Sequence, residues 1–328
     1  MSKGIYVYCE QRDGEIKNVS YELLGAANAL KASNGQEITA ILCGYGIRDK
    51  AQSLIEYGAD RVIVADYECL AHYITEPYAQ VVAYVIKEYD PNILLYPATS
   101  IGRDLAPRIS ARVNTGLTAD CTKLESDEEG NLFMTRPAFG GNLFATIICP
   151  DHRPQMSTVR PGVMQKLTPD AGRKGEIISV DVPFDTGLFS VELLEEVRDV
   201  VENDNIEDAK VLVSVGRGMK KYKDLAAELA ALIKGTVSCS RAVVDEGILP
   251  QSKQVGQTGK TVRPELYMAL GISGAVQHLA GMENSDYVVA VNKDKGANIM
   301  SVAQTGVCCD AKAFCEALIK EIKARKAQ

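Results

Sequence analysis

Short apolar runs alternate with amphipathic segments along the first hundred or so residues, and this alternation restricts the fold more than any other feature. The runs have the composition of strands, and the intervals between them have helical periodicity. Parallel strands joined by crossover helices produce this order, so the sequence predicts a doubly wound, mostly parallel α/β sheet. The predicted strands are 4–10, 37–46, 60–66 and 92–100, and the predicted helices lie near 20–33, 48–57, 76–89 and 101–113.

Two apolar runs within residues 131–150 are separated by the sequence Phe139-Gly140-Gly141-Asn142. Glycine and asparagine adopt the backbone angles that tight hairpin turns need, so these runs predict an antiparallel hairpin. The segment "MSTVRPGVM", residues 156–164, predicts one more strand. The first domain is therefore expected to add an antiparallel element to its mostly parallel sheet.

An acidic segment separates this domain from a second one. Residues 191–208 contain eight acidic side chains and one arginine, and they end in turn-forming Asn and Asp without apolar periodicity. We therefore predict one domain over 1–197 and another over 198–328. A second alternation follows and predicts a Rossmann-like, nucleotide-binding type of α/β domain. Its predicted strands are 209–215, 235–243, 286–292 and 298–306, and its predicted helices are 220–234 and a closing helix from Ala311.

Charge and hydropathy argue against several kinds of partner. The 328-residue chain has a formal net charge of −7 and no basic block, which argues against binding to nucleic acid or to anionic lipid. No segment reaches the roughly 18 continuous apolar residues of a membrane span, so no membrane insertion is expected. The N-terminus passes directly into a strand pattern without the features of a secretory signal. The expected location is the cytoplasm.

The nine cysteines are scattered along the chain without one C-x-x-C pair. This spacing fits neither a disulfide framework nor a zinc or iron–sulfur centre, so no metal site is predicted. Most are expected to be buried thiols. The adjacent Cys308 and Cys309 suit either oxidation or an ordinary strand end. No Ser/His/Asp arrangement or paired-carboxylate site indicates a catalytic residue.

Gly216-Arg217-Gly218 follows an apolar strand directly and precedes a helix. In this position, backbone amides and a helix N-terminus can receive a phosphate group. A dinucleotide fingerprint G-x-G-x-x-G would need a third glycine where Lys221 stands. The motif therefore fits either a phosphate-binding turn, which the guanidinium of Arg217 would favour, or a tight turn between strand and helix.

The sequence Gly-Lys-Thr at residues 259–261 resembles the end of a P-loop, but its spacing is wrong. A P-loop needs glycine at position 254, which is glutamine, and Pro264 opposes a helix that begins at Lys260. The better interpretation is a flexible loop between Gly256 and Gly259 that presents Gln257 and Thr258 to a planar ligand. A P-loop-like nucleotide-binding or hydrolysing protein is the alternative.

Gly271 and Gly274 flank Ser273, a residue that favours helix N-caps. A helix beginning there would point unpaired N–H groups at an anionic ligand, although small residues packed closely on a sheet give the same sequence. His278, in the first turns of that helix, is either a hydrogen-bonded core histidine or a functional one. In the second case its imidazole could donate to, or as imidazolium neutralise, negative charge on a reduced cofactor ring.

Ser240 and Arg241 close the second strand of the second domain. The carboxyl ends of parallel strands form the edge where ligands of open α/β sheets bind. Arg241 is therefore a candidate for binding an anionic ligand, and an ordinary solvated arginine is the other interpretation.

With these residues in order, the second domain resembles that of the electron transfer flavoprotein α subunit. The resemblance rests on Arg217, Ser240-Arg241, the segment 254–282 and "VVAVNKD", and it covers this domain by motif. The first domain resembles the family more loosely, through "TGLTADCT", "TRPAFGGN" and "HRPQMSTVRPGVM". These last motifs are similar to those of anaerobe-type α subunits that work with acyl-CoA dehydrogenases, including electron-bifurcating ones.

The resemblance implies that the second domain binds FAD. In the family, Arg241 would lie over the isoalloxazine, Thr258 near its N5 and His278 near its O2, with Asn292 toward the adenosine. The sequence "AQTGVCCDA" departs from the family pattern, which leaves the contact of Asp310 open. The residues that the resemblance places around FAD are Arg217, Ser240, Arg241, Val255, Gly256, Gln257, Thr258, Gly271, Ser273, Gly274, Ala275, Val276, Gln277, His278, Asn292 and Asp310.

The resemblance also implies partners. The expected assembly is a heterodimer with the electron transfer flavoprotein β subunit, contacted by the first domain. An acyl-CoA dehydrogenase would exchange electrons with it, and NADH or ferredoxin would act through the complex. The chain is then an electron carrier rather than a stand-alone catalyst. A nicotinamide dehydrogenase and a nonenzymatic adenine-nucleotide regulator are further alternatives.

Overall fold

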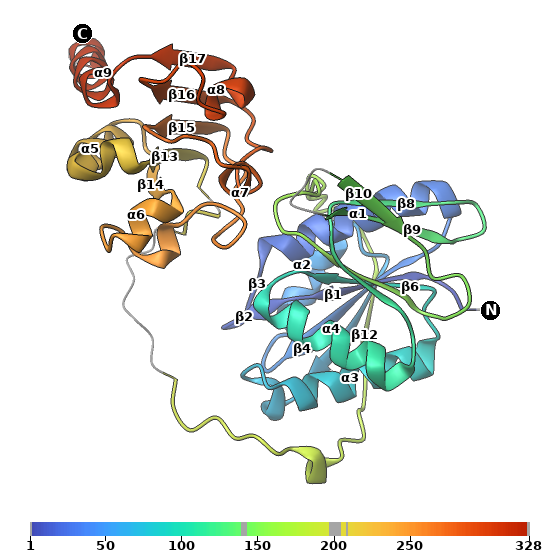
Figure 1. Cartoon of the computed structure of the whole chain (residues 1–328). Coiled ribbons are helices and arrows are strands. Elements are labelled where there is room, and N and C mark those ends of the chain that lie inside the picture. The colour runs from blue at the N-terminus through green and yellow to red at the C-terminus, as the bar shows by residue number, and fades with distance from the viewer. Residues whose placement is uncertain (1, 139–142, 197–204, 208, 327–328) are drawn as a thin grey trace. The chain divides into compact units, whose positions relative to one another are not determined.

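The computed structural model describes residues 2–138, 143–196, 205–207 and 209–326, which form two compact units, Met1–Glu196 and Val197–Gln328. Figure 1 shows that each unit is built around its own sheet. Both sheets are parallel and are covered by helices, so the chain has the predicted α/β fold with two sheets of the doubly wound kind.

The N-terminal unit contains a parallel sheet of seven strands in the order β12-β5-β4-β1-β6-β11-β7. The chain runs outward from β1 through β4 and β5 and then returns to β6 on the other side of β1, and this reversal is the pattern of a doubly wound sheet. The strand β7 then forms one edge, β11 lies between β6 and β7, and β12 forms the opposite edge beside β5. The strands are β1 (Ile5–Cys9), β4 (Ile38–Gly44), β5 (Arg61–Asp66), β6 (Ile93–Pro97), β7 (Leu117–Cys121), β11 (Gln155–Val159) and β12 (Glu176–Ser179).

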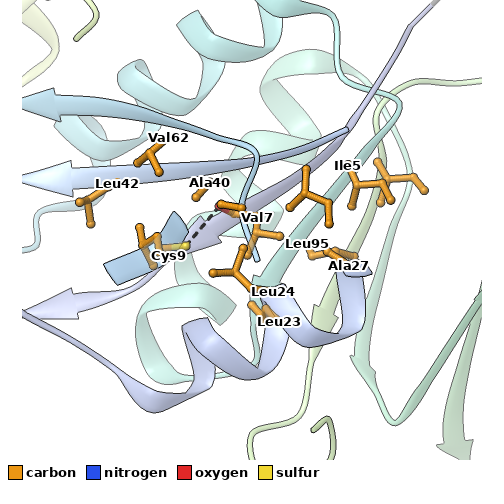
Figure 2. Packing of buried hydrophobic residues seen from close by; sticks show 14 of the residues in the cluster. Ile5, Val7, Cys9, Leu23, Leu24, Ala27, Ala40, Leu42, Val62 and Leu95 are labelled. Carbon is orange, nitrogen blue, oxygen red and sulfur yellow. Dashed lines mark hydrogen bonds between the residues drawn. The ribbon is translucent and has the colours of Figure 1, made fainter. Parts of the chain in front are cut away.

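Alternating side chains of the central strands enter two separate cores. Ile5, Val7 and Cys9 of β1 pack with α1 and α2, as Figure 2 shows for α1, whereas Tyr6 and Tyr8 pack with α3 and α4. A strand buried on both faces reads as a continuous apolar run, which explains the sequence of this region. The helices are α1 (Asn18–Asn34), α2 (Ala51–Glu56), α3 (Thr75–Tyr89) and α4 (Ser100–Val113).

A small antiparallel sheet completes this unit, in the order β10-β9-β8. The predicted hairpin is confirmed, because Leu143 pairs with Ala138 across β9 and β10. Its predicted turn, residues 139–142, lies outside the described residues. The strands are β8 (Lys123–Ser126), β9 (Leu132–Ala138) and β10 (Leu143–Ile147), and a short hairpin of β2 (Gln11–Arg12) and β3 (Glu15–Ile16) follows β1.

The C-terminal unit contains a five-stranded parallel sheet in the order β14-β13-β15-β16-β17. The strand order reverses between β13 and β15, and such a switch point is where doubly wound sheets bind ligands. The strands are β13 (Val211–Val215), β14 (Thr236–Cys239), β15 (Leu266–Leu270), β16 (Val288–Asn292) and β17 (Thr305–Cys308).

Five α-helices accompany this sheet in the described part of the chain. The two long ones, α5 and α9, pack on one face through Leu229 and Ile319. Loops and short helices cover the other face, where Val255, Val262 and Ile272 contribute to the core. The helices are α5 (Lys223–Leu232), α6 (Arg241–Asp245), α7 (Val276–Leu279), α8 (Ile299–Val302) and α9 (Ala311–Lys326).

Two predicted elements of this unit are wrong in part. Residues 298–306 were expected as one strand, but α8 occupies their first half, because the Ile299 N–H donates to the Ser273 carbonyl, 3.1 Å away, instead of joining the sheet. The predicted strand 235–243 ends at Cys239. The Val243 N–H bonds to the Ser240 carbonyl at 3.0 Å, and this turn starts α6.

Candidate functional site

Five of the predicted site residues lie at one edge of the C-terminal sheet. They follow or close successive strands, and because all five strands are parallel, they share the carboxyl edge. This is the edge at which open α/β sheets bind ligands. The residues are Arg217 after β13, Ser240 after β14, Gly271 after β15, Asn292 at the end of β16 and Asp310 after β17.

The loops after β13 and β15 touch through their glycines. The Gly216 N–H donates to the Leu270 carbonyl at 2.8 Å, and the Gly218 N–H to the Gly271 carbonyl at 3.3 Å. A Cβ atom on Gly216 would lie 2.2 Å from that Gly271 carbonyl oxygen, and Gly271 itself has a φ of +65°. Packing therefore accounts for these glycines, as the tight-turn interpretation predicted, while the side chain of Arg217 between them is exposed.

Arg241 presents an accessible guanidinium at the same edge. It begins α6, its side chain is 69% exposed, and its ion pair is with Asp245 on the next turn, 3.4 Å away. Ser240 occupies the N-cap position of that helix, but its hydroxyl makes no capping bond. An exposed pair of this kind contributes little to stability, so an anionic ligand can engage Arg241 at little cost.

The loop 254–260 attaches to the end of β14 and to α7. The Val255 N–H donates to the Cys239 carbonyl at 2.9 Å, and the Gln257 N–H to the Gln277 carbonyl at 2.7 Å. The side chains of Gln257 and Thr258 are exposed, as expected for residues that a loop presents to a ligand. Gly256 takes a φ of +141°, an angle open to glycine, which lets the chain turn between these two anchors.

Lys260 does not have the environment of a P-loop lysine. Its ammonium donates to the Asn205 side chain at 2.7 Å and lies 3.3 Å from the Glu207 carboxylate. No helix follows it directly, since the next element is β15. A P-loop needs both a free lysine and a phosphate-capping helix, so the nucleotide-hydrolysing alternative is not supported.

The predicted helix start at Ser273 is wrong. The helix α7 begins at Val276 with Ala275 in the N-cap position, and no side chain caps it. Gly274 has a φ of +81°, outside the range of a right-handed helix. Its backbone lies against Ile299, and a Cβ atom added to Gly274 would be 2.2 Å from the Ile299 nitrogen. Ser273, Ala275, Val276 and Gln277 are nevertheless exposed. Any ligand contact here comes from an irregular loop rather than from the end of a long helix.

His278 is a buried histidine with both ring nitrogens bonded. Nδ1 lies 3.1 Å from the Val255 carbonyl, and Nε2 lies 3.0 Å from the Tyr267 hydroxyl. A carbonyl only accepts, so Nδ1 carries the proton and Nε2 accepts from the tyrosine. Burial lowers the pKa of His278 to about 4, so the ring is neutral at physiological pH. In this structure the residue has the features of a hydrogen-bonded core histidine.

Asn292 and Asp310 lie at the same edge of the sheet, and both side chains are bonded to neighbouring residues. The Asn292 side chain donates to the Ile272 carbonyl at 2.7 Å and so fixes the loop after β15. The Asp310 carboxylate accepts from the Ala313 N–H at 3.0 Å and pairs with Lys293 at 2.7 Å. The hydrogen bond from Lys293 lowers the pKa of Asp310. Both residues thus have structural partners at the places where the resemblance expects FAD contacts.

Sequence reasoning missed three buried hydroxyl groups under this loop system. Ser214, Ser238 and Tyr267 lie inside β13, β14 and β15, and each is completely buried. The signal was available in the strands "VLVSV" and "TVSC", where a serine interrupts an otherwise apolar stretch. A buried polar group in such a place needs a reason, because it costs stability unless it is bonded.

The buried neutral state of His278 predicts a pH dependence of stability. Between pH 6.5 and about 4 the unfolded chain binds a proton that the folded one excludes, so the free energy of unfolding falls as the pH falls. Urea titrations of the cofactor-free chain should show a loss from pH 7 to 4.5 that exceeds the loss in His278→Gln by about 2 kcal/mol. Equal losses in the two proteins would contradict the buried neutral ring.

A parallel sheet with this switch point, glycine-rich loops and exposed arginines at its carboxyl edge defines a nucleotide-cofactor-binding α/β domain. Comparison with known proteins makes the assignment specific. The model of the electron transfer flavoprotein domain matches residues 5–185, and that of the electron transfer flavoprotein FAD-binding domain matches residues 205–283. The chain belongs to the electron transfer flavoprotein family, as an alpha-type subunit whose C-terminal domain binds FAD.

Three relatives cover nearly the whole chain. The electron transfer flavoprotein subunit alpha of Thermoanaerobacterium thermosaccharolyticum is 48% identical over 99% of both chains. The acryloyl-CoA reductase electron transfer subunit beta of Anaerotignum propionicum is 42% identical over 99% of this chain and 96% of its own. The lactate dehydrogenase (NAD(+),ferredoxin) subunit LctC of Acetobacterium woodii is 41% identical over 94% of this chain and 74% of its own.

The sequence predicts neither a membrane span nor a metal site. Among the residues that the structure describes, no helix is both long and apolar enough to cross a membrane. Within the same residues, no group of three or more His, Cys, Asp or Glu side chains is arranged to hold a metal ion.

Proposed function

We propose that this chain forms a heterodimer with a beta-type subunit and passes electrons, through its FAD, between an acyl-CoA dehydrogenase and other redox carriers. Residues 1–197 would contact the partner subunit, and residues 198–328 would hold the cofactor. The observation that carries the proposal is the gathering of the predicted cofactor residues along one carboxyl edge, in a domain that matches the FAD-binding family model. Bound FAD supplies the electron-transfer chemistry.

Different residues of this edge are suited to bind different parts of FAD. Arg217 and Arg241 offer exposed positive charge for the diphosphate and for negative charge on the reduced ring. Gln257 and Thr258 offer exposed polar side chains to the ring edge. His278 would respond to the charge of the ring from just below the loop. Asn292 and Asp310 would act mainly by holding the edge in shape, since their side chains already have partners.

The remaining assigned residues lie around these side chains, at the start of α6, in the loop 254–260, and in the loop after β15 that leads into α7. The N–H groups of Ser240, Val255, Gly256 and Gly271 already donate to carbonyls, so an anion would have to be bound by the exposed residues of the loop after β15. The remaining assigned residues are Ser240, Val255, Gly256, Gly271, Ser273, Gly274, Ala275, Val276 and Gln277.

The names of two relatives suggest the redox partners. One is an electron transfer subunit of an acryloyl-CoA reductase, and the other is a subunit of a lactate dehydrogenase that uses NAD(+) and ferredoxin. We extend the proposal to a complex in which NADH and ferredoxin exchange electrons with this FAD through a second flavin in the partner subunit. This would make the complex electron-bifurcating.

Co-expression with the partner subunit tests the function. We expect a yellow heterodimer with one FAD in this chain, and anaerobic addition of NADH should reduce two flavins at distinct potentials. Reduction of a single flavin, or none, would contradict the bifurcating extension but leave the carrier function in place. A colourless protein that cannot be loaded with FAD would contradict the carrier function itself.

A further inference from the structure

A row of buried hydroxyl groups lies under the proposed cofactor site. The hydroxyl of Tyr267 is 3.0 Å from Nε2 of His278. Ser214 lies on β13, next to the strand of Tyr267, and Ser238 occupies the paired position on β14, one strand further; both are completely buried. Burial raises the pKa of Tyr267, and a smaller, opposite effect comes from side-chain interactions of Ser214 and Ser238 with its hydroxyl. These interactions do not reach the geometry of a full hydrogen bond, so among the described residues both serine hydroxyls are without a well-formed partner.

The chemistry of these groups limits where each proton can be. Nδ1 of His278 keeps its proton because the Val255 carbonyl can only accept. In the neutral ring, Nε2 accepts, so Tyr267 donates. In a protonated ring, Nε2 also donates, so the Tyr267 oxygen has to accept and its own O–H must point to another acceptor. The unpartnered oxygens of Ser214 and Ser238 are the acceptors that this second arrangement needs.

We propose that Tyr267 is a positioning residue that lets His278 be either neutral or protonated. Its hydroxyl donates to Nε2 of the neutral ring, and it reverses to accept from Nε2–H of the charged ring by turning its own proton to Ser214 or Ser238. The proton gained by His278 comes from solvent and stays on Nε2. The inference rests on the proposed function, because it requires His278 to sense the charge of FAD.

The groups around His278 do not supply a negative charge that would favour its protonated form, so we assign that charge to the cofactor. Burial lowers the pKa of His278 and the Val255 carbonyl raises it, and among the described residues no charged side chain contributes to the shift. On the elements packed around it, the titratable groups are Tyr267 on β15, Cys239 at the end of β14, and Lys253 and Lys260 beside the loop. The thiol has a pKa near 12, and Lys260 is paired with Glu207. Negative charge on bound, reduced FAD would raise the pKa of His278.

The double variant Ser214→Ala/Ser238→Ala separates this role from a structural one. In the cofactor-free complex with the partner subunit, removing two unpartnered buried hydroxyls should leave thermal stability unchanged or raise it. In the loaded complex, the same change should weaken binding of reduced FAD relative to oxidised FAD about tenfold, which corresponds to about 30 mV for a two-electron couple. Ser157→Ala, at a buried serine of β11, is the control for the redox measurement and should leave the relative affinity for reduced and oxidised FAD unchanged; its hydroxyl donates to the Thr158 carbonyl at 3.4 Å, so it does not serve as a control for stability.

Nitrogen-15 NMR of labelled histidine provides a readout without bound FAD. The chain has three histidines, so the signal of His278 can be identified by its loss in His278→Gln. Tyr267→Phe should shift the Nε2 resonance, and the double serine variant should leave it as in the wild type, because the neutral ring does not use the serines. A shift in the double serine variant would overturn the proposal.

The redox measurements separate the inference from the proposed site. If His278→Gln changes the preference for reduced FAD but the double serine variant does not, the proposed role of Tyr267 and the two serines is wrong, while the proposed cofactor site is unaffected. If His278→Gln has no effect either, His278 does not sense FAD, and both the inference and that part of the proposed site fail.

Discussion

Replacing Gly274 with alanine is expected to lower the free energy of unfolding by about 3 kcal/mol or more and to prevent stable binding of FAD. Two effects combine. The φ of +81° strains any residue with a Cβ by about 1–2 kcal/mol. The added atom would also lie 2.2 Å from the backbone nitrogen of Ile299, so the loop after β15 and α8 must separate. That movement displaces the loop whose exposed residues line the proposed site.

Gly247→Ala is the matched control for this variant. Gly247 also has a positive φ, +70°, but an added Cβ would meet nothing within 4 Å. It should therefore show only the strain, about 1–2 kcal/mol, and should retain FAD. Urea unfolding followed by circular dichroism and the FAD content of the purified heterodimer measure both effects. Similar losses of stability in the two variants would mean that contact with Ile299 contributes nothing.

The architecture could be predicted because its signals are local. The strands of the N-terminal sheet are buried on both faces, so β1, β4, β5 and β6 appear in the sequence as apolar runs separated by helical periodicity. The strand order of the C-terminal sheet is not set by this alternation, and β15 lies within the glycine-rich segment 254–282, where the sequence predicts no strand. Residue types and spacing predict only that the candidate residues follow parallel strands, and the carboxyl ends of such strands share one edge.

The parts that failed depend on tertiary contacts. Ser273 has a good N-cap residue type, but the Ser273 carbonyl bonds to Ile299, twenty-six residues later, and this contact keeps the helix from starting there. Residues 298–306 have strand composition, yet the same contact turns their first half into α8. A propensity is a weak prior, and one long-range hydrogen bond is enough to override it.

The state of His278 could not be predicted for a related reason. Its place in the sequence suggested an imidazole available to a cofactor, and the resemblance supported that role. Its two partners come from distant segments, Tyr267 on β15 and the Val255 carbonyl in the loop, and together with burial they make the ring neutral. No spacing rule relates three such positions, so only the fold reveals the contact.

Arg241 should be the largest single contributor to FAD affinity among the exposed residues of the proposed site. Its guanidinium is 69% exposed and has one weak partner, Asp245 at 3.4 Å, so little is lost when it turns to a ligand. A hydrogen bond to a charged group contributes about 1.5–3 kcal/mol, more than a neutral one. The planar guanidinium can bind a phosphate with two bonds or stack on a ring, which lysine at the same position could not do equally well.

Arg241→Ala is therefore expected to weaken FAD binding by about thirtyfold, equivalent to about 2 kcal/mol, with the reduced cofactor affected more than the oxidised one because it carries more negative charge. Arg263→Ala is the matched control: it removes the same charge just before β15, at the opposite edge of the sheet, where the arginine lies 3.8 Å from Asp286. Fluorescence titration of the cofactor-free heterodimer with FAD measures both affinities. If the two variants bind FAD equally well, net charge rather than the position of Arg241 governs affinity, and its assignment to the cofactor site is wrong.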